Sequence, residues 1–176
     1  DPQSHNPLVS LATEPEPTDK DRVKAWALVV QEALQSLGEL GDPAALDDVL
    51  PLLDNKHPGI RQAAAQALVG IARPELADAI KPALQHADPE VKYRAALALA
   101  YGGDALGSSL IFSDAAAKVL SGIEQLAAAV TLGSSGEDRL ITFLDSQHEA
   151  LRHAALVILL ARDLTMHDGT PARCLG

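Results

Sequence analysis

Two histidines near the C-terminal end of the chain come close to the spacing of a zinc-binding helix. In the segment His148–His153 they lie five residues apart. The metalloprotease motif needs two histidines four apart, so that both lie on one face of a helix. At about 100° per residue, a separation of five puts them roughly 140° apart around the helix. We therefore predict no zinc site here, and a cysteine-based metal cage is excluded because Cys174 is the single cysteine.

The glycines of the segment Gly102–Ser109 have the spacing of a phosphate-binding loop. That loop requires a lysine after its second conserved glycine, and Ser108 stands at this position. We therefore interpret the segment as a connecting loop. Cys174 has no histidine at helical spacing, so a nucleophile is not expected there either. The sequence predicts no catalytic residue, no metal and no cofactor.

Composition narrows the fold class and the partners. The chain has 176 residues, of which 47% are hydrophobic but only 3% aromatic, and alanine and leucine dominate. This favours closely packed helices over strands. Acidic residues outnumber basic ones by 24 to 14, which argues against nucleic-acid binding and against attachment to an anionic membrane. No apolar run approaches the roughly 20 residues of a membrane span. A single cysteine fits a cytoplasmic location.

An internal period of about 31 residues determines the predicted architecture. The segment Ile60–Leu68 matches Val91–Leu99 after a shift of 31, and Val91–Leu99 matches Leu151–Leu159 after a further shift of 60. Each begins with an aliphatic residue and a base and continues as an alanine-rich apolar run. Stepping by the same period adds one unit before and one between, with anchors at Leu37, Leu68, Leu99, Val130 and Leu159. Repeated matches of this kind indicate a solenoid.

Each unit is predicted to be a pair of antiparallel helices. The first helices are expected at Pro43–Asp54, Pro74–His86 and Glu137–Ser146, and the second at Asp21–Leu40, His57–Ile71, Pro89–Tyr101, Ala115–Leu132 and His148–Ala161. Pro51 and Pro82, 31 residues apart, should each remove a backbone hydrogen bond from a first helix. Residues 1–20 are expected to be an acidic, proline-rich and partly extended lead-in, residues 21–162 the repeat array, and residues 163–176 a turn and the start of another, truncated repeat.

The repeating segments resemble the HEAT and HEAT-like (phycobilisome-lyase type) family. The resemblance rests on Leu52–Asp54 followed by Ile60, Arg61, Ala64 and Leu68, and on Ala87–Lys92 followed by Ala95, Ala96 and Leu99. It implies an all-α solenoid of four to five two-helix repeats wound into a right-handed superhelix. It also implies that the second helices line a concave surface on which a protein or peptide binds.

Two rows of equivalent positions follow from the repeat phase. One row supplies Gln31, Gln62, Tyr93, Glu124 and His153. The last four of these, with the neighbouring Arg94, are our predicted partner-binding residues. The preceding row contains Val30, Arg61, Lys92, Ile123 and Arg152, three of which are bases. These bases could pair with Asp54 and Asp145 in a structural ladder, or they could face a partner, and the sequence leaves both open.

The function expected from these observations is a non-catalytic scaffold for protein–protein interaction. The alternative is a bilin-lyase-like enzyme or chaperone on the same repeat fold, which would need an apolar, aromatic-lined groove. A DNA-repair glycosylase on helical repeats conflicts with the acidic charge. The chain begins at Asp1 and shows no polar capping repeat, so we expect a segment of a longer protein and possible end-to-end self-association through uncapped repeats.

Overall fold

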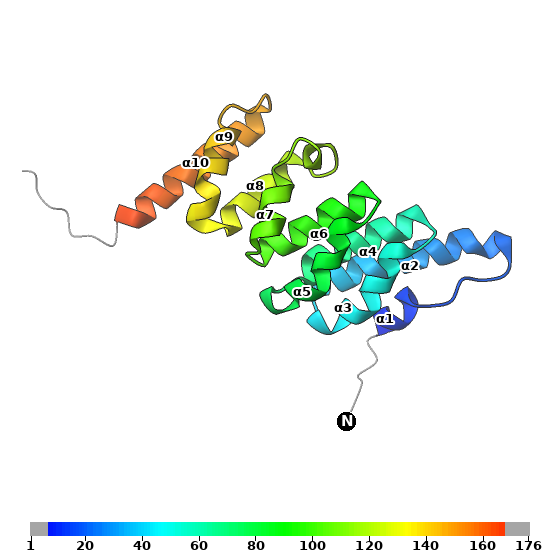
Figure 1. Ribbon diagram of the computed structural model, residues 1–176. Coiled ribbons are helices and arrows are strands. Elements are labelled where there is room, and N and C mark those ends of the chain that lie inside the picture. The colour runs from blue at the N-terminus through cyan, green and yellow to red at the C-terminus, as the bar shows by residue number, and fades with distance from the viewer. Residues whose placement is uncertain (1–6, 168–176) are drawn as a thin grey trace, which may run out of the picture. The chain divides into compact units, whose positions relative to one another are not determined.

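The computed structural model describes residues 7–167, apart from the side chains of residues 20–21, 134–135 and 162–167. Within this range it contains ten α-helices, joined by 3-10 turns and loops, and no β-strand (Figure 1). The predicted all-α class is confirmed. The chain divides into two compact units, Asp1–Leu120 and Ser121–Gly176. In the described part of the chain, no helix has the length and apolar character required to cross a bilayer.

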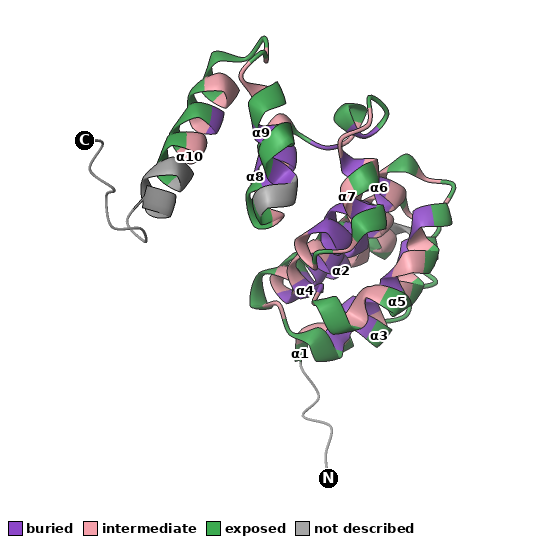
Figure 2. Cartoon of the chain, turned by 60° about the vertical axis from the view of Figure 1, so that its left-hand side comes forward, coloured by how far each residue is buried: buried purple, intermediate pink, exposed green. Residues whose placement is uncertain are grey.

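The first unit is built from two layers of helices. Its long layer contains neighbours packed side by side: α2 (Lys20–Leu40), α4 (Pro58–Ile71) and α6 (Pro89–Tyr101). Its short layer packs against them, with α1 (Pro7–Ala12) on α2, α3 (Leu46–Val49) on α4 and α5 (Ala77–Ile80) on α6. Figure 2 shows that buried residues gather between the two layers. This stacked arrangement of helix pairs is the one that the period predicts.

The short layer is irregular because of its prolines. Pro51 lies in the 3-10 turn Leu50–Asp54, and Pro82 lies in the 3-10 turn Lys81–Gln85. Proline lacks the N–H that would continue the helical ladder. The two expected first helices are therefore single α-helical turns followed by 3-10 turns, as the matched prolines predict.

The apolar anchors of the period behave differently in the two units. Leu37, Leu68 and Leu99 are at most 1% exposed, whereas Val130 is 38% exposed. The core of the helix that contains Val130 uses Leu126 and other neighbours instead. The exact 31-residue register therefore holds in the first unit and fails at Val130.

The interpretation of Gly102–Ser109 as a loop is wrong in its second half. Helix α7 spans Ala105–Ile111 and packs against α6. Asp104 begins this helix, because its carboxylate accepts hydrogen bonds from the backbone amides of Leu106 (2.8 Å) and Gly107 (3.3 Å). The N-cap aspartate thus starts a helix in a segment whose glycines suggested a loop.

The second unit contains α8 (Gly122–Thr131), α9 (Glu137–Phe143) and α10 (Glu149–His167). The helix predicted over Ala115–Leu132 is split: a 3-10 turn covers Ala116–Lys118, and α8 begins only after Ser121. The sequence predicts a turn from residue 163, but helix α10 continues to His167, so that prediction is also wrong. The predicted helix start at Thr170 and Pro171, like Cys174, lies outside the described residues.

The described part of the acidic lead-in packs against α2 and the turn before α4. Its Leu8–Leu11 segment belongs to α1, and the indole Nε1 of Trp26 donates to the carbonyl of Glu14 (2.9 Å). Glu16 lies 2.6 Å from Nζ of Lys56 and 3.3 Å from Nε2 of His57. The hydrogen bond from Lys56 is the largest influence that lowers the pKa of the Glu16 carboxyl below its usual value. These contacts place residues 13–16 beside the turn that precedes α4.

Candidate functional site

The row of bases is structural in at least one repeat junction of the first unit. Arg61 donates from Nε to Oδ2 of Asp88 (3.0 Å), and its Nη2 lies 2.9 Å from the same oxygen. Asp88 in turn caps α6 by accepting from the amide of Glu90 (3.0 Å). One guanidinium thereby connects α4 to the start of the next long helix.

The expected partners of the base row need correction. Arg61 pairs with Asp88 and not with Asp54, whose carboxylate instead lies 3.2 Å from Nε2 of His86. Asp145 is exposed and makes no ion pair within the described part of the chain. Asp54 ends the 3-10 turn Leu50–Asp54, and Asp145 lies in the turn that follows α9. Arg61 instead reaches the aspartate at the N-cap of the next long helix.

Two arginines of the base row make the same second contact, with a backbone carbonyl. Nη1 of Arg61 donates to the carbonyl of Asn55 (2.9 Å), and Nη1 of Arg152 donates to the carbonyl of Ser146 (2.7 Å). In both cases the acceptor lies six residues before the arginine, at the turn that enters the helix. Lys92 does something different, since its Nζ lies 5.7 Å from the centre of the Tyr93 ring. We therefore assign Arg61 and Arg152 to the support of the turn.

The same turn carries a repeated hydrogen bond that sequence reasoning missed. In three repeats a side chain accepts a hydrogen bond from the backbone amide two residues later. Asn55 accepts from His57 (2.9 Å), His86 accepts from Asp88 (3.0 Å) and Ser146 accepts from His148 (3.2 Å). The three acceptors are separated by 31 and 60 residues, which is the spacing of the period itself. Each satisfies an amide at the beginning of a long helix. The differing residue types concealed the equivalence.

The predicted partner-binding residues have different surroundings. Gln62 is exposed on α4, whereas Tyr93 is only 9% exposed and belongs to the core. Arg94 is half-buried, pairs with Glu90 and donates to Oε1 of Gln66. Tyr93 was expected at the surface because its position aligns with Gln62. The equivalence fails because α6 is buried along most of its length.

The other two predicted residues lie in the second unit. Glu124 is occupied in a capping box: its Oε2 accepts from the amide of Ser121 (2.8 Å), while the Ser121 hydroxyl accepts from the amide of Glu124 (3.2 Å). His153 is exposed on α10. In the preceding row Ile123 is 72% exposed, although its equivalent Val30 is buried. Of the five predicted residues, Gln62 and Arg94 are the two that line one hollow.

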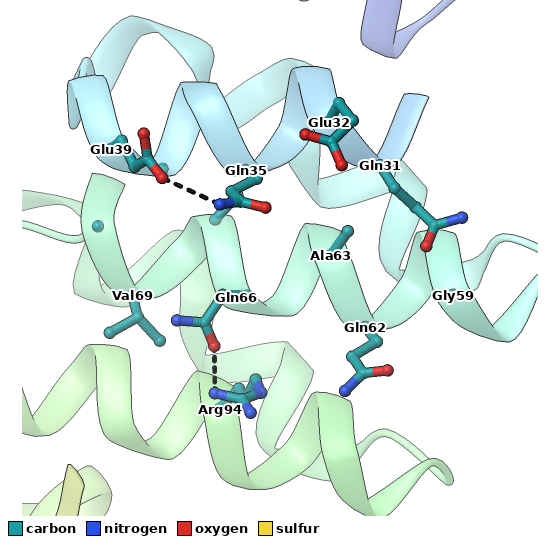
Figure 3. Close-up of a pocket in the computed structure, with 13 residues that line it drawn as sticks. Gln31, Glu32, Gln35, Glu39, Gly59, Gln62, Ala63, Gln66, Val69 and Arg94 are labelled. Carbon is teal, nitrogen blue, oxygen red and sulfur yellow. Dashed lines mark hydrogen bonds between the residues drawn. The ribbon is translucent and has the colours of Figure 1, made fainter. Parts of the chain in front are cut away.

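That hollow lies across α2 and α4 and has a volume of about 530 Å³ (Figure 3). Two glutamines come from each helix, one turn apart, and two glutamates come from α2. We call it the glutamine groove, and its polar lining is formed by Gln31, Gln35, Gln62, Gln66, Glu32 and Glu39. Arg94 of α6 lies at its edge, and Gly59 and Ala63 of α4 also line it. Ala63, Ala67 and Val69 add apolar surface between the polar side chains, and aromatic side chains are absent among the residues that line the groove.

Sequence periodicity contained the signal for most of this groove. Gln31 and Gln62 occupy equivalent positions in the row that we used, and Gln35 and Gln66 repeat the same 31-residue step one turn later. Extending the row by four residues would have found the second pair. The hollow itself depends on how closely α2 and α4 approach, which the row does not specify.

Comparison of the sequence with protein-family models agrees with the stacked helix pairs of the first unit. A family model described as HEAT repeats matches residues 24–100 and again residues 49–123. The chain is a HEAT-repeat protein. The matched residues contain most of α2 and all of α4 and α6, and they include the whole glutamine groove of this HEAT-repeat array. The phycobilisome-lyase subtype is not part of that match, and no curated protein matches the chain.

The chemistry that the HEAT-repeat face offers is hydrogen bonding and charge. Among the described residues no group of three or more histidine, cysteine, aspartate or glutamate side chains is placed to hold a metal ion. Neutral carboxamides carry both a donor and an acceptor, and they neither titrate nor act as nucleophiles. The groove is therefore suited to recognising a polar surface.

Proposed function

We propose that this HEAT-repeat chain is a non-catalytic interaction module that binds a protein partner through the exposed face of α2 and α4. The observation that carries the proposal is the glutamine groove, in which four carboxamides and two carboxylates surround a hollow of about 530 Å³. HEAT repeats are generally scaffolds for protein interaction, and this face is formed by the long helices of consecutive repeats.

Rigid support below the groove favours a binding role. The helices that carry the glutamines are held from behind by a dense core, in which Leu34, Leu37, Ile60 and Leu68 are fully buried. The backbone positions from which the glutamines project are therefore fixed before a ligand arrives, which lowers the entropy cost of binding. The bilin-lyase alternative gains no support from this groove, because a pigment would need apolar and aromatic walls.

Site-specific photo-crosslinking tests the proposal. A benzophenone amino acid is placed at position 62 in the groove and, as a matched control, at the exposed position 79 of the short layer. Both full-length chains are irradiated in a lysate of the source organism, and adducts are identified by mass spectrometry. We expect protein adducts specific to position 62 that disappear when Gln35 and Gln66 are changed to alanine. Equal labelling from both positions would contradict a binding role for the groove.

A further inference from the structure

Building on the proposed function, we infer that the glutamine groove binds an extended peptide segment carrying lysine or arginine, held through its main chain. The inference rests on three features of the groove: which ends of the carboxamides are available, how they are spaced, and which charges surround them.

Internal hydrogen bonds determine which end of each carboxamide is available. On α2, the Nε2 of Gln31 donates to the carbonyl of Ala27 (3.0 Å), and the Nε2 of Gln35 donates to Oε1 of Glu39 (3.1 Å). On α4, the Oε1 of Gln66 accepts from Arg94. Helix α2 therefore presents two carboxamide oxygens as acceptors, whereas Gln66 presents its Nε2 as a donor.

Gln62 adds a second carboxamide on α4. It makes no hydrogen bond to any part of the chain that the structure describes, so its Nε2 can donate beside that of Gln66. One wall thus accepts and the other donates. A peptide main chain offers N–H groups and carbonyls on both of its edges, and it can satisfy both walls at once.

The spacing along each helix fits an extended chain. Gln31 and Gln35, like Gln62 and Gln66, are four residues apart, which is a rise of about 6 Å along the helix axis. In an extended strand, groups that point to the same edge recur every two residues, or roughly 6.6 Å. A strand lying along α2 and α4 can therefore give N–H groups to Gln31 and Gln35 and carbonyls to Gln62 and Gln66.

A small side chain in the groove allows the main chain of a ligand to approach. Ala63 lines the groove and carries only a methyl group, whereas Gly59 is covered by the carboxamide of Gln31 and Gly38 packs against Ala67. A backbone can come closest to a surface where Cβ atoms are absent or small. Bulky side chains would keep the strand away from the glutamines.

The charges in the groove favour a basic ligand. Glu32 and Glu39 are exposed, and neither makes an ion pair in the part of the chain that the structure describes. The one cation at the edge, Arg94, is paired with Glu90. The whole chain has a net charge of −10. Cationic side chains on the peptide would be attracted to this face, and two of them would be needed to pair with Glu32 and Glu39, which lie about 10 Å apart along α2.

Fluorescence polarisation with synthetic peptides tests the inference on the full chain. The probe is a fluorescein-labelled nonapeptide of serine and threonine that contains two lysines, in versions with one, two or three residues between them. Matched peptides replace the lysines with glutamate or serine, and another carries N-methyl groups on alternate main-chain amides. We expect at least one lysine peptide to bind about tenfold more tightly than its glutamate and serine counterparts, and N-methylation to remove that binding.

Protein variants separate the two components of recognition. Gln35→Ala and Gln66→Ala are each expected to weaken binding of the lysine peptide about three- to tenfold, since each removes one hydrogen bond. The double variant Glu32→Gln/Glu39→Gln is expected to weaken it about tenfold and to reduce its dependence on salt. Gln85→Ala and Glu75→Gln, exposed and outside the groove, are the controls and should bind like the parent chain. Circular dichroism establishes that every variant is folded.

Three results would overturn the inference. These are no lysine peptide binding more tightly than its glutamate counterpart, binding that survives N-methylation, or binding that is unchanged in Gln35→Ala and Gln66→Ala. The photo-crosslinking experiment is independent of the peptide panel. Groove-specific adducts together with a failed lysine panel would leave the interaction module intact and refute only its preference for a basic, extended ligand.

Discussion

The backbone of Gly70 in α4 rests against the backbone of Gly38 in α2. A Cβ atom added at Gly70 would lie 1.9 Å from the carbonyl oxygen of Gly38 and 2.7 Å from its carbonyl carbon. Two long helices that line the glutamine groove therefore touch without intervening side chains. The two glycines are 32 residues apart, one more than the repeat period, and they belong to consecutive repeats.

Gly70→Ala should destabilise the first unit. The new methyl group would meet backbone atoms, which cannot rotate away, so α2 and α4 must separate at a cost of about 1–3 kcal/mol. The matched control is Gly59→Ala in the same helix, where the new atom meets only the flexible end of Gln31. Urea denaturation followed by circular dichroism measures both. Similar unfolding free energies for the two variants would show that the backbone contact at Gly70 is unimportant.

Arg73 is expected to hold the ends of two helices. Its Nη1 donates to the carbonyls of Gly70 (3.0 Å) and Ala72 (2.7 Å) at the end of α4, and its Nη2 donates to that of Gly41 (2.9 Å) after α2. A cation is favoured where free carbonyls gather at helix C-termini. Only a forked guanidinium reaches both helices.

Replacing Arg73 by lysine should lower the unfolding free energy by about 1.5–3 kcal/mol, although the charge is kept. Chemical denaturation measures this loss. The control is Arg22→Lys on the exposed surface of α2, which should leave stability nearly unchanged. If lysine at position 73 preserved full stability, charge alone would explain the role of Arg73, and the fork geometry would not.

The pair between Arg61 and Asp88 predicts a specific acid sensitivity. Burial alone would raise the pKa of Asp88, but the hydrogen bonds from Arg61 and from the amide of Glu90 outweigh burial and lower it. The unfolded value is about 3.9. Because the folded pKa lies below it, the stabilisation is fully present above that value and is lost as the pH falls through the folded pKa.

Asp88→Asn should therefore reduce the loss of stability between about pH 5 and pH 2, while asparagine still caps α6. Near neutral pH the variant should be less stable by roughly 0.5–1.5 kcal/mol. Unfolding free energies measured across this pH range test the prediction. Asp47→Asn, at an exposed aspartate without an ion pair in the described structure, is the control. Parallel pH curves for the parent chain and Asp88→Asn would contradict it.

In the turn before each long helix, asparagine should be able to replace histidine as the hydrogen-bond acceptor. His86 accepts a hydrogen bond at Nδ1 from the amide of Asp88, and Asn55 makes the equivalent bond one repeat earlier. His86→Asn should therefore keep most of the stability, whereas His86→Ala should lose about 1 kcal/mol, because it leaves the amide without its acceptor. Thermal and urea unfolding distinguish the two. Equal losses for asparagine and alanine would indicate that the ring packs and does not accept.

Much of the first unit could be predicted from the sequence because its local and repeating signals agree. The alanine-rich runs, the matched prolines and the step of 31 between Leu37, Leu68 and Leu99 predict helix pairs with one buried face. The same step predicts where Gln31 and Gln62 lie. Where the apolar repeat weakens, as around Val130, local capping by Ser121 determines where the helix starts, and the period misplaces it.

The sequence by itself determined the helical class, the order of the repeats and the exposed polar rows, because these depend on spacing along one chain. Only the tertiary structure decided that Tyr93 is buried, that Arg61 selects Asp88, and that two glutamine pairs surround one hollow. Those outcomes depend on the separation of neighbouring helices. Between α2 and α4, where the groove lies, Gly38 and Gly70 set that separation through direct backbone contact. A one-dimensional pattern specifies which face a residue occupies, whereas the distance to the next helix depends on all the side chains packed between them.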